Sequence, residues 1–272
     1  MKILVVGISV RAMVESAVKS RYSVVALDAF GDQDLRSLAE SYSLRRDFSV
    51  PYSPAALYQT GRNLDFDAVA YTSNLENHPG ILDRFSRNCR IIGNSPQSIR
   101  EVRRWPDLFS KLRSAGFSVP ETVFSGDGEG GDSSLGWLLK PVLSGGGHGI
   151  SFSKEKAIPG NRFMLQQYVP GKSCSASFVS NGCESVLLGI TEQLIGLRPF
   201  GVQGFRYCGN ILPLPALLEN ATGEKIVEQV RRVADFITDH HAWDLFVCNL
   251  LSRTVGWSWE IPDLANVFFN SG

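Results

Sequence analysis

The chain has 272 residues, 43% of them hydrophobic, and its 27 basic and 27 acidic side chains balance to a formal net charge of zero. This length accommodates one large domain or roughly two to three lobes, and the balanced charge excludes the electrostatic footprint of a general nucleic-acid binder. No window approaches the about 18 apolar residues of a membrane span, so we expect a globular, cytoplasmic protein that binds neither nucleic acid nor membranes.

The amino-terminal part, residues 2–97, alternates short apolar runs with amphipathic stretches. Strands are predicted at Ile3–Val6, Val24–Leu27, Ala68–Tyr71 and Arg90–Ile92. Strand-helix alternation of this kind predicts a small parallel α/β sheet. Ligands of such sheets bind beyond the carboxyl ends of the strands, where the turn at residues 72–77 is the most polar. Its Glu76 and Asn77, with His78, suit substrate contact, and capping of the following helix is the competing interpretation.

The turn after the first strand offers two interpretations. Gly7-Ile8-Ser9 lacks the third glycine of a dinucleotide fingerprint, yet Asp28 lies about 20 residues on, where a ribose-binding acid would stand. Glycine is commonly needed for the strand-to-helix turn itself. We favour such a turn and keep NAD binding as the alternative.

The middle of the chain reads as a helical linker followed by a loop. Apolar residues between 98 and 117 recur at three- and four-residue spacings that are interrupted at Pro106, which predicts a helical segment with a break. The glycine-rich stretch 126–134 is predicted to be a surface loop.

The second half is predicted to be mainly antiparallel. A long helix is expected around residues 226–237, where apolar residues fall at helical spacing. The predicted strands are Trp137–Leu139, Ile150–Phe152, Phe163–Gln167, Ser173–Val179, Val186–Ile190, Leu245–Leu251 and Val255–Ile261.

A glycine-rich segment lies between two of these strands. Lys140 ends the first, and the segment 141–149 contains four glycines before the next strand begins. Glycines let a backbone approach a ligand closely and present N–H groups to phosphate oxygens. The segment is no Walker loop, because Gly-Lys-Ser/Thr and a following helix are both missing. A phosphate-binding loop and a plain β-hairpin both remain open.

Further along the chain, the segment Leu165–Gly171 is a strand that ends in a Pro-Gly turn. Together with Lys140 and its glycine loop, this hinge resembles the nucleotide site of the ATP-grasp superfamily. More narrowly, three segments resemble a group of predicted ATP-dependent carboligases in that superfamily: Leu75–Pro79, Ile92–Pro96 and Phe205–Pro213.

The resemblance covers nearly the whole chain and implies an α/β, ATP-grasp fold. Its parts would be a Rossmann-like, parallel α/β lobe at residues 1–97, a linker helix and central lobe with the glycine loop at 98–165, and a carboxyl-terminal lobe at 166–272. The two nucleotide-binding lobes would be mainly antiparallel α+β. We expect the last lobe to be shortened or altered.

The resemblance also implies roles for individual residues in binding ATP. Lys140 would contact the α- and β-phosphates, Arg104 would supply a second phosphate contact, and the flexible loop would cover the phosphates. The hinge would hold adenine through main-chain groups of Gln167 and Val169. The implied cofactor-binding set is Arg104, Lys140, Ser144, Gly145, Gly146, Gly147, Gln166, Gln167, Tyr168, Val169 and Ser173, the last at the position of a ribose-binding glutamate.

One residue is a candidate for catalysis. Arg206 could bind a substrate carboxylate or an acyl phosphate, because arginine makes bidentate contacts with such groups. A structural salt bridge is the competing interpretation of this residue.

The metal end departs from the family pattern. Mg²⁺ (or Mn²⁺) bridging the phosphates needs hard oxygen ligands, and Asn249 and Glu260 are the nearest equivalents of the family's ligands. The asparagine expected two residues after Glu260 is missing, although Asp263 could supply an oxygen.

The implied function is an ATP-dependent carboxylate-amine ligase, or one with a related nucleophile, that works through an acyl phosphate and releases ADP and phosphate. Its partners would be small-molecule carboxylate and amine substrates, with a homodimer as an open assembly. The alternative is an ATP-binding protein with an impaired metal site and no ligase activity.

Overall fold

The structure is a computed structural model of the chain and describes residues 1–72, 74–127, 130–131, 134–155, 157–214, 221–241 and 245–252. These residues fall into two compact units, of which the first comprises residues 1–101 and the second begins at Val102. The finer division into three lobes stays a prediction. No helix in the described ranges has both the length and the apolar character needed to cross a membrane.

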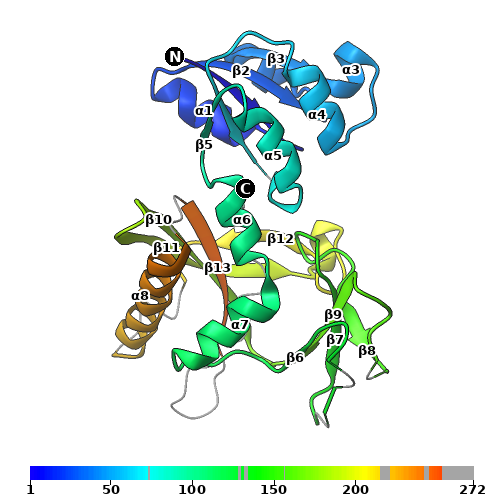
Figure 1. The fold of residues 1–272 in the computed structure, drawn as a ribbon, viewed down its shortest axis with the longest axis vertical. Coiled ribbons are helices and arrows are strands. Elements are labelled where there is room, and N and C mark those ends of the chain that lie inside the picture. The colour runs from blue at the N-terminus through cyan, green and yellow to red at the C-terminus, as the bar shows by residue number, and fades with distance from the viewer. Residues whose placement is uncertain are drawn as a thin grey trace. The chain divides into compact units, whose positions relative to one another are not determined.

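Unit 1 is built on a five-stranded parallel sheet with the strand order β3-β2-β1-β4-β5 (Figure 1). The strands are β1 (Lys2–Val6), β2 (Ser23–Asp28), β3 (Glu40–Ser43), β4 (Ala68–Tyr71) and β5 (Arg90–Ile92). The helices are α1 (Arg11–Lys19), α2 (Gln33–Leu38), α3 (Leu44–Phe48), α4 (Pro54–Gly61), η1 (Leu75–Asn77), α5 (Pro79–Ser86) and α6 (Pro96–Val102). The predicted parallel α/β sheet is confirmed.

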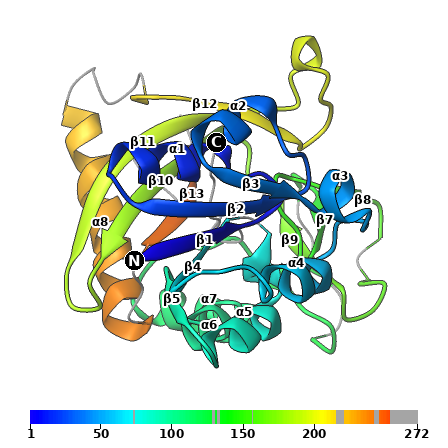
Figure 2. The ribbon, with the colours of Figure 1, turned by 90° about the horizontal axis from the view of Figure 1, so that it is seen from above.

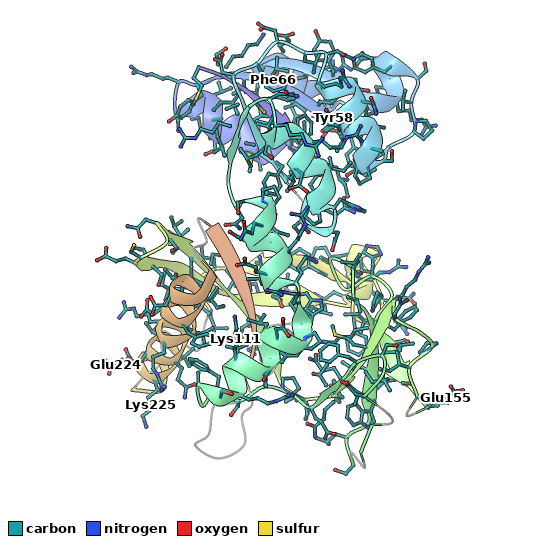
Figure 3. All side chains as sticks on the ribbon, viewed as in Figure 1. Tyr58, Phe66, Lys111, Glu155, Glu224 and Lys225 are labelled. Atoms are coloured by element: carbon teal, nitrogen blue, oxygen red, sulfur yellow. The ribbon has the colours of Figure 1, made fainter. Side chains whose placement is uncertain are left out.

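Both faces of this sheet are buried, which explains the continuous apolar runs of its central strands. Leu4 and Val6 of β1 belong to one core cluster, and Ile3 and Val5 belong to another. Tyr58, labelled in Figure 3, packs in the first cluster, where its ring meets that of Phe85 edge-on with centroids 5.0 Å apart.

Unit 2 contains two four-stranded sheets with the orders β6-β9-β7-β8 and β12-β11-β10-β13, and all their recorded strand pairs are antiparallel (Figure 1). The first sheet comprises β6 (Thr122–Val123), β7 (Trp137–Pro141), β8 (Ser151–Ser153) and β9 (Phe163–Gln167). The second comprises β10 (Lys172–Ser180), β11 (Ser185–Ile195), β12 (Tyr207–Ile211) and β13 (Leu245–Ser252), with η2 (Arg198–Phe200) between β11 and β12. The mainly antiparallel character predicted for this half is confirmed, while the predicted strand Val255–Ile261 lies outside the described residues.

Two helices accompany these sheets, α7 (Trp105–Ser114) and α8 (Ala221–His241). Pro106 lies in the first turn of α7, where the missing N–H of a proline costs a helix nothing. The expected break in the helical segment therefore comes before Pro106. Phe109 of α7 and Val230 of α8 pack with Phe178 of β10 in the core of the unit. Lys111, labelled in Figure 3, lies on the exposed side of α7.

Figure 2 shows the sheets of the chain from above, with α8 running along the sheet that contains β10 and β11. The core-facing positions of β10 are Cys174, Ala176 and Phe178. Because side chains alternate along a strand, Ser173, Ser175 and Ser177 belong to the opposite face of this sheet.

Candidate functional site

Lys140 lies at the end of β7 and is only 4% exposed. Its ammonium donates a hydrogen bond of 2.6 Å to the side-chain oxygen of Gln166 on the adjacent strand β9. The amide nitrogen of Gln166 in turn donates to the hydroxyl of Thr122 on β6, at 3.0 Å. Three neighbouring strands of one sheet therefore fix the lysine at the base of the glycine loop.

The glycine loop joins β7 and β8 as an antiparallel hairpin. Gly146, Gly147 and Gly149 have φ values of +57°, +73° and +76°, in the left-handed region that only glycine enters without strain. The hydroxyl of Ser144 donates to the carbonyl of His148 at 2.6 Å, and the N–H of His148 donates to the carbonyl of Gly145 at 3.1 Å. The loop is thus internally bonded, with His148 exposed.

The loop is also docked, by main-chain atoms, on the segment that leads into β12. The N–H of Tyr207 donates to the carbonyl of Gly146 at 3.0 Å. A Cβ on Gly147 would overlap the carbonyl oxygen of Phe205, so the close approach requires glycine. Arg206, between these two contacts, is exposed, and its carbonyl accepts from the N–H of Gly196 at 2.8 Å. The structure therefore brings the predicted catalytic arginine beside the predicted phosphate loop.

Two main-chain N–H groups of the hinge after β9 donate hydrogen bonds within the protein. The N–H of Gln167 donates to the carbonyl of Glu121 at 2.8 Å, and the N–H of Tyr168 donates to that of Gly136 at 3.0 Å. Between described residues, no hydrogen bond involves the N–H of Val169. Within the described part of the chain, Val169 is therefore the one residue of 167–169 whose N–H has no protein acceptor.

Aromatic rings lie beside this hinge. Tyr168 and Phe152 of β8 meet edge-on with centroids 5.0 Å apart, and the centroid of Phe205 is 5.5 Å from that of Phe152. Phe152 is 58% exposed although it is a large apolar side chain. The three rings connect the hinge, the strand after the glycine loop and the segment that carries Arg206.

The part of the chain that holds these residues matches a known family. Residues 106–240, which include Lys140, the glycine loop, the hinge and Arg206, match the family model of the ATP-grasp domain. Residues 106–240 of the chain therefore form an ATP-grasp domain. An uncharacterized protein of Methanocaldococcus jannaschii is 25% identical over 245 residues, which are 83% of this chain and 61% of that protein. The chain thus spans less than two thirds of that relative's length.

Solved structures share the ATP-grasp fold. A protein of Archaeoglobus fulgidus assigned to the ATP-grasp superfamily has a TM-score of 0.65 at 16% identity, over 99% of this chain and 82% of that one. The biotin carboxylase of Campylobacter jejuni has a TM-score of 0.68 at 12% identity, over 93% and 62%. N5-carboxyaminoimidazole synthetase of Staphylococcus aureus, complexed with ADP, has a TM-score of 0.63 at 18% identity, over 95% and 68%. Two of these similar structures are thus of proteins named as a carboxylase and a synthetase.

Arg104, the second expected phosphate contact, directly precedes α7 of the ATP-grasp domain. Its guanidinium is exposed and lies 3.5 Å from the carboxylate of Asp107. The next residue, Trp105, donates its indole N–H to the carbonyl of Val142 at 3.2 Å, which ties the start of α7 to the start of the glycine loop. The phosphate contact of Arg104 stays a prediction.

Ser173, at the expected ribose position, lies on β10, and Asn249, one of the two expected metal ligands, lies on β13. Asn249 is the Cα partner of Ser175, and Ser173 is two residues before Ser175 on the same sheet face. The Ser175 hydroxyl lies 2.7 Å from that of Thr191 on β11. Glu260 lies outside the described residues. Within the described ranges, no group of three or more His, Cys, Asp or Glu side chains gathers to hold a metal.

The amino-terminal unit tests the dinucleotide alternative. Asp28 is fully buried, and one of its carboxylate oxygens accepts the N–H groups of Phe30 and Gly31 at 3.0 and 2.7 Å. Burial raises the pKa of this carboxyl, against the lowering effect of these N–H groups. A Cβ on Gly7 would overlap the hydroxyl of Thr72. Both residues therefore build the strand-end turns, which supports the turn over NAD binding.

The polar turn after β4 lies at the same carboxyl edge of that sheet. Glu76 and Asn77, in η1, are 3% and 8% exposed, and the Thr72 hydroxyl donates to the carbonyl of Ser9 at 3.1 Å. These side chains are thus largely inside the protein. Their contact with substrate stays a prediction.

Sequence reasoning missed three groups of this site. Thr122 lies in a strand of two residues with no periodic pattern to reveal it. Phe205 and Tyr207 contact the glycine loop through their main chain, which no side-chain pattern encodes. Phe152 had a signal, because it lies in a predicted strand directly after the loop.

Proposed function

We propose that this protein binds ATP and uses the γ-phosphate to activate a small-molecule carboxylate, after which an amine or related nucleophile displaces phosphate from the acyl phosphate. ADP and phosphate would be the other products. The observation that carries the proposal is the main-chain docking of the glycine loop beside Arg206, with Lys140 fixed at the base of the same loop. Loop and cations of this kind suit a triphosphate.

The described residues would serve the nucleotide at both of its ends. At the phosphate end, Lys140 and the N–H groups of a loop rich in left-handed glycines would face oxygens of the α- and β-phosphates. At the adenine end, the N–H of Val169 and the carbonyl of Gln167 would pair with the base edge. Tyr168 and Phe152 supply apolar rings beside that edge.

Arg206 would bind the carboxylate and the phosphoryl group in transfer. Its side chain is exposed, while the carbonyl bond to Gly196 and the docked glycine loop hold its backbone. A guanidinium held in this way orients two anions and stabilises the charge that spreads over the phosphoryl oxygens. The carboxylate oxygen attacks phosphorus, ADP leaves, and the nucleophile then replaces phosphate at the carbonyl carbon.

A metal ion forms part of the proposal. Mg²⁺ (or Mn²⁺) would neutralise phosphate charge, with Asn249 and Glu260 as its protein ligands. The backbone register, in which Asn249 is the Cα partner of Ser175, supports this assignment. Titration of ATP with and without Mg²⁺, in the wild type and in Glu260→Ala, tests this assignment, and equal affinities in all four titrations would contradict it.

Hydroxylamine trapping tests the reaction. The protein is incubated with ATP, hydroxylamine and a panel of carboxylic acids, because hydroxylamine converts an acyl phosphate to a stable hydroxamate. We expect ADP, phosphate and hydroxamate in equal amounts, and AMP formation would refute the mechanism. Arg206→Ala should lose the hydroxamate, whereas Arg198→Ala, at another exposed arginine in the same stretch of chain, should retain it.

One observation favours a second function, that of an ATP-binding protein without ligase activity. The described part of the sheet face around Asn249 carries Ser173, Ser175, Ser177 and Thr191, which are neutral hydroxyl residues rather than carboxylates. Tight ATP binding that ignores Mg²⁺, together with no ADP formation across the acid panel, would support this second function.

A further inference from the structure

The side chain of Gln166 is engaged in a buried chain of hydrogen bonds. It is 1% exposed, its oxygen accepts from the Lys140 ammonium at 2.6 Å, and its nitrogen donates to the Thr122 hydroxyl at 3.0 Å. The Thr122 hydroxyl donates onward to the carbonyl of Pro120 at 3.1 Å. Gln166 therefore meets Lys140 with its side chain, whereas the resemblance assigned it to the adenine hinge.

Donor and acceptor chemistry fixes the direction of this chain. An ammonium has only donors, so the Gln166 atom that faces Lys140 must be the amide oxygen. The hydroxyl hydrogen of Thr122 is given to Pro120, so its oxygen accepts from the amide nitrogen of Gln166. Turning the amide over would set donor against donor at Lys140 and would break the bond to Thr122. Thr122 thereby orients the amide, and the amide orients the lysine.

We propose that Gln166 is a positioning residue for Lys140: its amide, oriented by Thr122, holds the ammonium at the base of the glycine loop without adding negative charge. The inference rests on the proposed function, because it takes Lys140 as a phosphate contact. A glutamate at this position would make the same hydrogen bond but would neutralise the ammonium as an ion pair. The neutral amide instead holds the ammonium without bringing a carboxylate to it.

A double-mutant cycle tests whether Gln166 acts through Lys140. The dissociation constants of ATP, ADP and adenosine are measured by titration calorimetry on the full chain for the wild type, Gln166→Met, Lys140→Met and the double variant, after thermal melts confirm folding. Gln166→Met should weaken ATP and ADP about tenfold, as expected for a hydrogen bond to a charged group, and should change adenosine by less than about twofold. The double variant should bind ATP like Lys140→Met alone.

Two further variants test the charge and the orientation. Gln166→Glu should weaken ATP more than Gln166→Met does, whereas Gln59→Glu, at an exposed position of α4, should leave ATP binding unchanged. Thr122→Val, nearly the same shape without the hydroxyl, should weaken ATP several-fold and spare adenosine. Thr122→Val also carries the test if neither Gln166 variant folds.

The outcomes separate this inference from the proposed function. Equal losses for ATP and adenosine in Gln166→Met, additive losses in the double variant, or wild-type ATP affinity in Gln166→Glu would each overturn the positioning role while ATP binding by the wild type still stands. A wild type that binds no ATP overturns the proposed function, and the positioning role with it.

Discussion

The docking of the glycine loop depends on the missing side chain of Gly147, so Gly147→Ala is the most direct perturbation of the site. An alanine at φ +73° costs about 1–2 kcal/mol of backbone strain. Its Cβ would also overlap the Phe205 carbonyl, so the loop must move away and lose the bond from Tyr207 to Gly146, worth about 0.5–1.5 kcal/mol. The docked loop is thus disfavoured by about 2 kcal/mol, or roughly thirtyfold in population.

A matched glycine separates the contact from the strain. Gly201 has φ +75°, and a Cβ there would meet no atom within 4 Å. We expect Gly147→Ala to weaken ATP roughly thirtyfold in titration calorimetry, because undocking has to be reversed before the loop can cover the phosphates. Gly201→Ala should carry the same strain, lower the melting temperature and leave ATP affinity within about twofold. Wild-type affinity in Gly147→Ala, or equal losses in both variants, would refute the assignment of the docked loop to ATP binding.

Three other variants test the fold and the base of the loop. Gly7→Ala should lower the free energy of unfolding by about 1–3 kcal/mol, because the new Cβ would overlap the Thr72 hydroxyl. Adding Thr72→Ala should therefore recover part of that loss, and additive losses in denaturant titrations would contradict this prediction. Burial raises the folded-state pKa of Asp28 above 3.8, so the folded protein binds the Asp28 proton more tightly than the unfolded chain does. Lowering the pH toward 3.8 should therefore stabilise the wild type relative to Asp28→Asn. A difference in unfolding free energy between the two proteins that stays constant across pH would contradict this prediction. Trp105→Phe removes the indole donor to Val142 and should weaken ATP a few-fold, and it should also lower the melting temperature because Trp105 is buried in the core of unit 2. Unchanged ATP affinity would show that this tie does not position the loop.

The parts of the fold that the sequence predicts share one physical property, which is burial of a contiguous apolar run. The predicted limits of Ala68–Tyr71, Arg90–Ile92 and Phe163–Gln167 agree with β4, β5 and β9. The strand β3 (Glu40–Ser43) escapes prediction because it is a polar strand at the edge of the described sheet, where it pairs with β2, so its residues carry little apolar signal.

The candidate site divides in a similar way. The lysine and the glycine loop can be predicted because four glycines in nine residues after a strand-ending lysine form an unusual local pattern, and their order relative to the hinge adds specificity. The docking of Gly146 and Gly147 on residues 205–207 cannot be predicted from the sequence, because contacts between main-chain atoms far apart in sequence leave no side-chain pattern. The role of Gln166 was missed for a related reason, since a hinge assignment concerns its backbone while its side chain serves Lys140.

Main-chain docking has a consequence for the chemistry of the site. Because the loop is held through the Gly146 carbonyl and the Phe205 backbone, docking consumes no charged side chain, and no ion pair between described residues involves Arg206. Loop closure and delivery of a guanidinium to the phosphates would then be one event. ATP binding would depend on Lys140 and this loop in a ligase and in a non-catalytic protein alike, whereas ADP formation would also require Arg206 and the metal. Loss of turnover at unchanged ATP affinity in Arg206→Ala would therefore assign catalysis to the arginine, and loss of affinity alone would assign it to binding.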